Sequence, residues 1–244
     1  KETNKLVEEF SRSIQFDYKL AEYDCMGSLC HIEVLKKANL LTSIEHKKLR
    51  AGLTGILASI KEGKFTIDPS FEDIHSYIQY LLEKDPNVQE AALKLHTCRS
   101  RNDQIVFDVK FYCLENINQI RESIKGLNLV LNDLAVKNIH IQIPGYTHLQ
   151  RAMPVKLYSY FSSHIQMLNR DWKRLENAFE NIDLTMGAGA LAGTMIQAGQ
   201  YDQAVSTLPK PIKASVNSID TVSDRDFVIE ILSGLSILQM HLSR

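Results

Sequence analysis

NDQIVFDVKFYCLENINQIRESIKGLNLVLNDLAVK, residues 102–137, is the stretch that decides the fold class. Its apolar side chains recur at steps of three and four, which places them on one stripe of an α-helix. The stripe consists of Val106, Val109, Cys113, Ile117, Ile120, Ile124, Leu127, Leu131 and Leu134. Because an average helix has about 11 to 12 residues, a single helix from about Asn102 to Lys137 is unusually long. We interpret the stripe as core packing that carries the frame of the protein and none of its chemistry.

Two further stripes follow the same rule. One runs from Tyr158 to Ile182 and predicts a helix that begins at Pro154, since proline is tolerated in a first helical turn. The other runs from Val228 to Leu242, close to the last residue, Arg244. Long stripes of this kind are typical of helices that pack at roughly 20° in a bundle. We therefore predict an all-α fold with a long-helix central bundle, and we expect the sequence to be a fragment in which this bundle is incomplete.

The first 95 residues show shorter helical patterns. Thr42 and Glu45 form a predicted capping box at the start of a helix, 63–70 reads as a loop, and a short helix is expected over 71–82. The only alternating pattern, at 140–143, is too short to predict a useful strand. We predict an N-terminal helical domain at 1–95 and the truncated bundle domain at 96–244.

Composition excludes several classes of protein. The 244 residues carry a net charge of −1 and 44% apolar side chains, which describes an ordinary soluble protein and excludes a disordered one. With so little net charge, no general attraction to nucleic acid or an anionic membrane is implied. The four cysteines fit neither a disulfide framework nor a paired metal-ligand spacing, so we expect a reducing, cytoplasmic location.

One cluster of polar residues, 96–104, stands immediately before the first long helix. It contains Ser100, Arg101 and Asn102. Guanidinium, hydroxyl and amide groups at a helix amino terminus suit a carboxylate or a phosphate, because the free backbone N–H groups of the helix point the same way. The alternative is a solvated helix cap.

A second cluster, 144–151, stands before the second long helix and contains Thr147, His148 and Gln150. A histidine among hydrogen-bonding groups can transfer a proton near neutral pH. The alternative is a structural histidine.

A third cluster and a glycine-rich stretch are less specific. Glu72, Asp73 and His75 lie at the start of a short helix, where acidic residues commonly cap. The glycine-rich residues 186–194 follow a helix and not a strand, so a dinucleotide-binding motif is rejected in favour of a tight turn or close helix packing.

Taken together and in order, these segments resemble the argininosuccinate lyases, a family of the fumarase/aspartase superfamily. The resemblance covers nearly the whole chain. The stretches that carry it are 10–17, 72–75, 96–104, 144–154, 189–194 and 217–227.

The resemblance implies a homotetramer that reversibly cleaves argininosuccinate into arginine and fumarate by elimination, without metal or organic cofactor. Residue by residue, Asn102, Thr147 and Ser13 match substrate-binding positions, and His148 matches the proton-transfer histidine. The family's other proton carrier lies in a Gly-Ser-Ser loop that these 244 residues do not contain, so we expect it downstream of Arg244. Cys98 departs from the family by replacing a glycine, where its side chain would restrict a turn.

The implied reaction also requires other residues of these clusters. Removing a proton from a carbon next to a carboxylate places negative charge on that carboxylate, which requires preorganised donors. Ser100 and Arg101 are such donors beside Asn102, and His75 and Gln150 would support the site from nearby.

Geometry predicts an oligomer. A helix of about 36 residues is roughly 54 Å long, and Asn102 stands at its start while His148 follows its far end. Because Asn102 and His148 are both expected to contact one small substrate, the active site must combine residues of different subunits. Two alternatives remain open at this point: a sister lyase acting on another succinyl adduct such as adenylosuccinate, and a catalytically inactive, crystallin-like relative.

Overall fold

The structure, a computed structural model, describes residues 5–201, 208 and 210–244. The chain divides into two compact units, one formed by Lys1–Tyr112 with Asp183–Asp224 and the other by Cys113–Ile182 with Arg225–Arg244. These units are defined by contacts within the chain, and the domain boundary expected between residues 95 and 96 stays a prediction.

Short helices build most of the first unit. They are α1 (Lys5–Ser11), α2 (Ile14–Asp17), the 3-10 helix η1 (Tyr18–Leu20), α3 (Ala21–Lys37), α4 (Ser43–Lys61), α5 (Ile74–Lys84) and α6 (Gln89–Ala92). Helices α3 and α4 pack on each other through fully buried side chains such as Ile32, Leu35, Leu49 and Leu53. This apolar packing forms the core of the unit that carries the first and third polar clusters.

The structure confirms two of the local features predicted for this unit and shifts the start of a third. The capping box is confirmed, because the Thr42 side chain accepts from the Glu45 backbone while the Glu45 carboxylate accepts from the Thr42 backbone. The loop over 63–70 is confirmed as well. The short helix begins at Ile74 and not at residue 71, because the Asp73 side chain accepts from the Ser76 N–H and caps the helix there.

The long helix α7 (Arg101–Lys137) confirms the central prediction of the sequence. Its apolar stripe is only partly buried: Val106, Ile117 and Ile124 are inside, whereas Leu127 and Leu134 are 37% and 39% exposed. The helix contributes its first 12 residues to one unit and the rest to the other, so one straight stripe does not describe its buried face. The largest side chains that the stripe omitted from the core are Phe107, Phe111 and Leu114.

The second long helix, α8 (Leu157–Asn181), starts later than predicted. Residues 154–156 belong to a β-hairpin of β1 (Gln142–Thr147) and β2 (Gln150–Lys156), in which Pro154 lies opposite Pro144. Expecting Pro154 in a first helical turn was therefore wrong, as was dismissing the alternating pattern at 140–143. Proline is tolerated in this hairpin because each strand of a two-stranded sheet has one edge without a partner.

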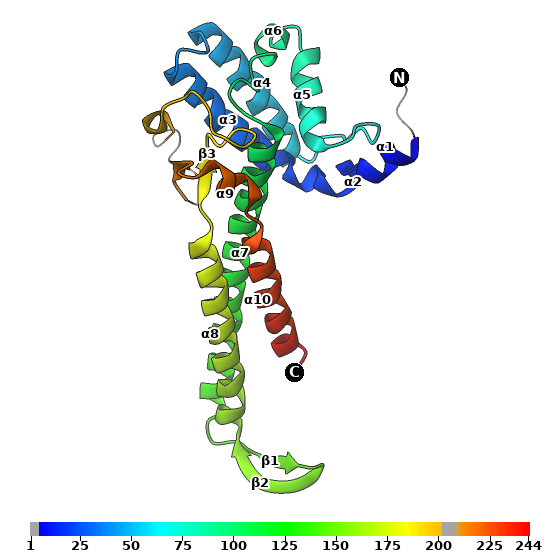
Figure 1. Ribbon diagram of the computed structural model, residues 1–244. Helices are drawn as coiled ribbons and strands as arrows, with labels where there is room; N and C mark the ends of the chain where they lie inside the picture. The colour runs from blue at the N-terminus through cyan, green and yellow to red at the C-terminus, as the bar shows by residue number, and fades with distance from the viewer. Residues whose placement is uncertain (1–4, 202–207, 209) are drawn as a thin grey trace. The chain divides into compact units, whose positions relative to one another are not determined.

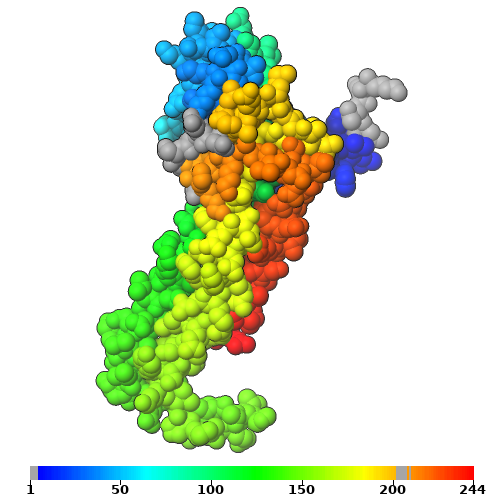
Figure 2. All heavy atoms as spheres, turned by 60° about the vertical axis from the view of Figure 1, so that its left-hand side comes forward, coloured from blue at the N-terminus to red at the C-terminus, as the bar shows by residue number. Residues whose placement is uncertain are grey.

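Helix α10 (Asp226–Leu242) confirms the third stripe and packs on α8. Figure 1 shows α8 and α10 beside the later part of α7, and Figure 2 shows the hairpin at the end of the same group of helices. Buried Asp171 of α8 accepts from Arg174 and contacts His241 of α10 at 2.6 Å. The second unit is thus a bundle of long helices, in agreement with the all-α expectation.

The chain returns to the first unit after α8. There β3 (Leu184–Met186) pairs in parallel with β4 (Ile212–Ala214), and the short helices η2 (Ala198–Gln200) and α9 (Ser218–Ser223) complete the described residues. Among the described residues, no helix is both long and apolar enough to cross a membrane.

Candidate active site

The amino terminus of α7 presents the first cluster of polar residues. The Asp103 carboxylate accepts the Ser100 N–H at 2.8 Å, and the Ser100 hydroxyl accepts the Asn102 N–H at 3.2 Å. The Arg101 guanidinium donates to Gln104 Oε1 at 2.7 Å and to Ser76 Oγ at 3.3 Å. These bonds fix Ser100, Arg101 and Asn102 at the amino terminus of a long helix, an end whose dipole favours negative charge.

The start of α5 meets the start of α2 in the same unit. The Ser13 N–H donates to the Glu72 carbonyl at 2.8 Å, and the Ser13 hydroxyl donates to Asp17 Oδ2 at 2.5 Å. The other oxygen of Asp17 accepts the Ile74 N–H at 3.1 Å. Two segments far apart in the sequence are therefore tied together at the position of the third predicted cluster.

A groove of about 460 Å³ runs along this junction. Its polar lining includes Ser13, Asp17, Asp73 and His75, and Ile105, Val109 and Tyr112 of α7 supply apolar lining. Arg101 reaches the same helix start, with its Nε 3.7 Å from Asp73 Oδ2. The structure thus brings three of the predicted site residues, Ser13, His75 and Arg101, into one region.

The glycine-rich stretch folds as the tight turn that was expected. Gly187, Gly189 and Gly193 have φ values of +91°, +59° and +86°, in the left-handed region that favours glycine. The Gly189 N–H donates to Asp103 Oδ2 at 2.8 Å, and the Asn102 side chain donates to the Ala190 carbonyl at 3.2 Å. The turn therefore contacts the first residues of α7 directly.

Thr147, His148 and Gln150 belong to the second unit, at the tip of the β-hairpin. Thr147 pairs with Gln150 across the turn, while His148 and Leu149 have φ values of +50° and +61°. Two central residues with positive φ are typical of a type I′ turn, which usually contains asparagine or glycine. His148 and the exposed Leu149 therefore hold this turn at a cost in backbone strain.

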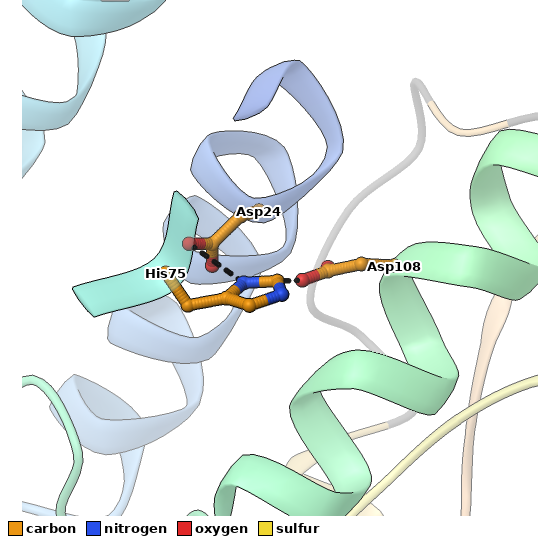
Figure 3. Close-up of side chains that lie close together, drawn as sticks. All are labelled: Asp24, His75 and Asp108. Atoms are coloured by element: carbon orange, nitrogen blue, oxygen red, sulfur yellow. Dashed lines mark ion pairs between the residues drawn. The ribbon is translucent and has the colours of Figure 1, made fainter. Parts of the chain in front are cut away.

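His75 has two partners that sequence reasoning missed. Its Nδ1 lies 3.2 Å from Asp24 Oδ2 and 3.5 Å from Asp108 Oδ2, and all three side chains are buried (Figure 3). The available signal was a pair of aspartates on the apolar faces of α3 and α7, because a buried carboxylate requires a partner.

The two carboxylates differ electrostatically. Burial would raise the pKa of Asp24, but the neighbouring His75, with help from Arg99 and Gln104, lowers it to about 2. Burial, followed by repulsion from Asp24, raises the pKa of Asp108 well above its ordinary value. Asp24 is therefore the stable anion of the pair.

Asp24, His75 and Asp108 are also close enough together to coordinate a metal ion, since their ligand atoms lie within 4.8 Å of one another. The Arg99 guanidinium is buried beside both carboxylates and already supplies positive charge there. A divalent cation would add to that charge, so we interpret the cluster as an ion-pair network.

The sequence matches the family described as Lyase over residues 1–244. With its long-helix frame, the chain belongs to this lyase family, in the fumarase/aspartase superfamily.

Similar proteins make the relationship more specific. Argininosuccinate lyases from Moorella thermoacetica and Alkaliphilus metalliredigens are 42% and 43% identical to this chain over 99% and 100% of its length. The chain spans about half the length of these relatives, 52% in each case.

Solved structures share the fold. A fumarate lyase:delta crystallin from Brucella melitensis, bound to cobalt, matches 96% of this chain and 55% of its own with a TM-score of 0.79 at 18% identity. An EDDS lyase variant with bound fumarate matches 93% of this chain and 45% of its own with a TM-score of 0.71 at 22% identity. These matches confirm the predicted fold class.

Proposed function

We propose that the complete protein is an argininosuccinate lyase, which reversibly eliminates fumarate from argininosuccinate to leave arginine. The observation that carries the proposal is the identity of 42% to 43% with two argininosuccinate lyases across nearly all of this chain. We assign the protein to arginine biosynthesis in the cytoplasm, and the four free cysteines support a reducing compartment. The proposed reaction uses no metal or organic cofactor.

The start of α7 suits the anionic part of the substrate. As a proton leaves the carbon next to a carboxylate, that carboxylate gains charge and is stabilised by donors already in place. Ser100, Arg101 and Asn102 supply hydroxyl, guanidinium and amide donors at a helix amino terminus. In this proposal Ser13 and Asn102 bind the substrate, and His75 supports them from the wall of the groove.

The hairpin supplies the proton carrier. His148 is exposed at the turn, and an imidazole can move a proton near neutral pH. Thr147 and Gln150 flank it and would bind the substrate through their side chains.

We propose a homotetramer whose active sites are shared between subunits. Helix α7 has 37 residues and therefore rises about 55 Å between the Asn102 end and the end that leads to His148. The long-helix unit also exposes large apolar side chains that a neighbouring subunit would cover, among them Leu129, Val130, Ile229 and Leu232.

A substrate comparison tests the proposed reaction. The protein expressed from its complete gene is mixed with argininosuccinate or with adenylosuccinate, and fumarate is measured by its absorbance. Fumarate from argininosuccinate supports the proposal. Fumarate from adenylosuccinate alone would indicate a sister lyase, and no fumarate from folded protein would indicate an inactive relative.

A further inference from the structure

Asp103 is a buried carboxylate in the first turn of α7, and each of its two oxygens has a partner. Its Oδ1 accepts the Ser100 N–H at 2.8 Å, as the acidic residue of a capping box does. Its Oδ2 accepts the Gly189 N–H at 2.8 Å, from a segment 86 residues further along the chain. Only 6% of Asp103 is exposed. The local cap accounts for Oδ1 alone, so the bond to Oδ2 requires another explanation.

The partner of Oδ2 belongs to the glycine-rich turn, residues 187–194. Gly189 is buried with a φ of +59°, and a Cβ at this position would lie 2.9 Å from the Gly193 carbonyl oxygen. The turn is closed by the Gly193 N–H, which donates to the Ala188 carbonyl at 2.8 Å. Glycine at 189 therefore allows a tight turn in which the N–H is bonded to the Asp103 carboxylate.

The same turn contacts the side chain of Asn102. Its Nδ2 donates to the Ala190 carbonyl at 3.2 Å, and Ala190 directly follows the glycine that Asp103 holds. Both segments belong to the same compact unit. One carboxylate thus holds the backbone next to Asn102 and also the turn to which the amide of Asn102 is bonded.

The charge of Asp103 depends on both segments. Burial raises the pKa of Asp103, while the N–H groups of Ser100 and Gly189 act in the opposite direction and stabilise the anion. Hydrogen bonds to an ionised carboxylate are stronger than those to a neutral group. An asparagine at this position would have one acceptor oxygen in place of two, so it would keep one of the two bonds at most.

We propose that Asp103 is a positioning residue that holds the glycine-rich turn against the start of α7 and thereby orients the side chain of Asn102. The inference rests on the proposed function for the assignment of Asn102 to substrate binding. A side chain that is already ordered loses little conformational freedom when a ligand binds, which favours binding. Asp103 acts through Asn102, since both of its own oxygens are bonded to backbone N–H groups.

Amide hydrogen exchange in the complete protein tests the anchor without turnover. In the unaltered protein the Gly189 N–H should exchange about a hundredfold or more slower than in an unstructured peptide, because it is buried and bonded to a carboxylate. In Asp103→Asn, the Ser100 N–H or the Gly189 N–H should exchange about tenfold faster, according to which of them loses its acceptor.

Asp183→Asn is the matched control, because the Asp183 carboxylate is exposed and bonded to Lys213 at the surface. It should leave both exchange rates unchanged. A Gly189 N–H that exchanges freely in the unaltered protein would overturn the proposal, and this reading needs no variant. Unchanged rates at both positions in Asp103→Asn would overturn it as well.

Binding of fumarate separates positioning from general stability. Measured by calorimetry, Asp103→Asn should raise the Kd of fumarate by about tenfold. In an Asn102→Leu background the same change should raise the Kd by less than about threefold, because the amide that Asp103 orients is already gone. Equal weakening in both backgrounds would contradict the proposal. The exchange rates need no ligand, so they stay separate from the outcome of the fumarate assay.

Discussion

Cys98 is held with a φ of +56°, in the left-handed region that side chains disfavour. It lies directly before Arg99 and lines a cavity of about 10 Å³, the size of one water molecule, together with Arg99 and Asp103. The thiol therefore occupies a backbone position suited to glycine at the edge of the candidate site. The resemblance to argininosuccinate lyases predicts the same preference, since glycine is usual at this position in that family.

Replacing this residue should relieve the strain. Cys98→Gly is expected to increase the free energy of unfolding by up to about 1 kcal/mol, because a left-handed conformation costs a side-chain-bearing residue about 1 to 2 kcal/mol and added flexibility of the unfolded chain offsets part of the gain. Urea unfolding of the complete protein measures the difference. Cys98→Ala is the control, since it keeps Cβ and the strain. Equal stabilisation by alanine would show that the thiol, and not the backbone, is responsible.

At His148 the prediction concerns catalysis. His148→Asn should lower kcat by about 100-fold or more, because asparagine tolerates the positive φ of the turn but cannot transfer a proton. Steady-state kinetics with argininosuccinate measure this change. Leu149→Asn, the neighbouring position with φ +61°, is the matched control and should keep most of kcat. An unchanged kcat with a raised KM in His148→Asn would make His148 a binding residue only.

At the scale of elements, helix α4 offers a test of local stability. The Thr42 side chain accepts the Glu45 N–H at 3.2 Å and satisfies one free donor of the helix. Thr42→Ala should therefore lower the free energy of unfolding by about 1 kcal/mol, measured by urea denaturation. Ser43→Ala, one position further and exposed, should change it by less than half that amount. Equal losses in both variants would mean that the capping box contributes nothing measurable.

The elements differed in how well the sequence predicted them. Helices α7 and α10 followed from apolar spacing alone, because a long repeat averages over local exceptions. The β-hairpin did not, since Pro144 and Pro154 are opposed across it and proline more often argues against a strand.

The sequence predicted some residues of the candidate site and missed others. Ser13, His75 and Arg101 were identified from local polar clusters and the family resemblance, and the structure brings them to one region. Asp24 and Asp108 were not identified, because each is a single charge on an apolar helix face and its partner is distant in sequence. Pairings of this kind depend on tertiary packing, which no local pattern contains.

At the scale of the whole molecule, one question concerns how a complete site forms. Asn102 stands at the start of the 37-residue helix α7, and His148 follows the end of that helix in the β1–β2 hairpin, so the proposed reaction is expected to take them from different subunits. The long-helix unit exposes apolar side chains on α7 and α10, where neighbouring subunits would pack. Shared active sites are therefore the central claim of the proposed function.

Mixing two inactive variants tests this claim most directly. Asn102→Leu and His148→Asn are each expected to be nearly inactive alone, since each removes one part of every site. When the two are unfolded, mixed in equal amounts and refolded together, about a quarter of the sites should receive an intact Asn102 from one subunit and an intact His148 from another. The measurement is the rate of fumarate release from argininosuccinate, with each variant refolded alone as the control. Recovery of about a quarter of the unaltered activity is the predicted result, and no recovery from a correctly assembled mixture would contradict the account.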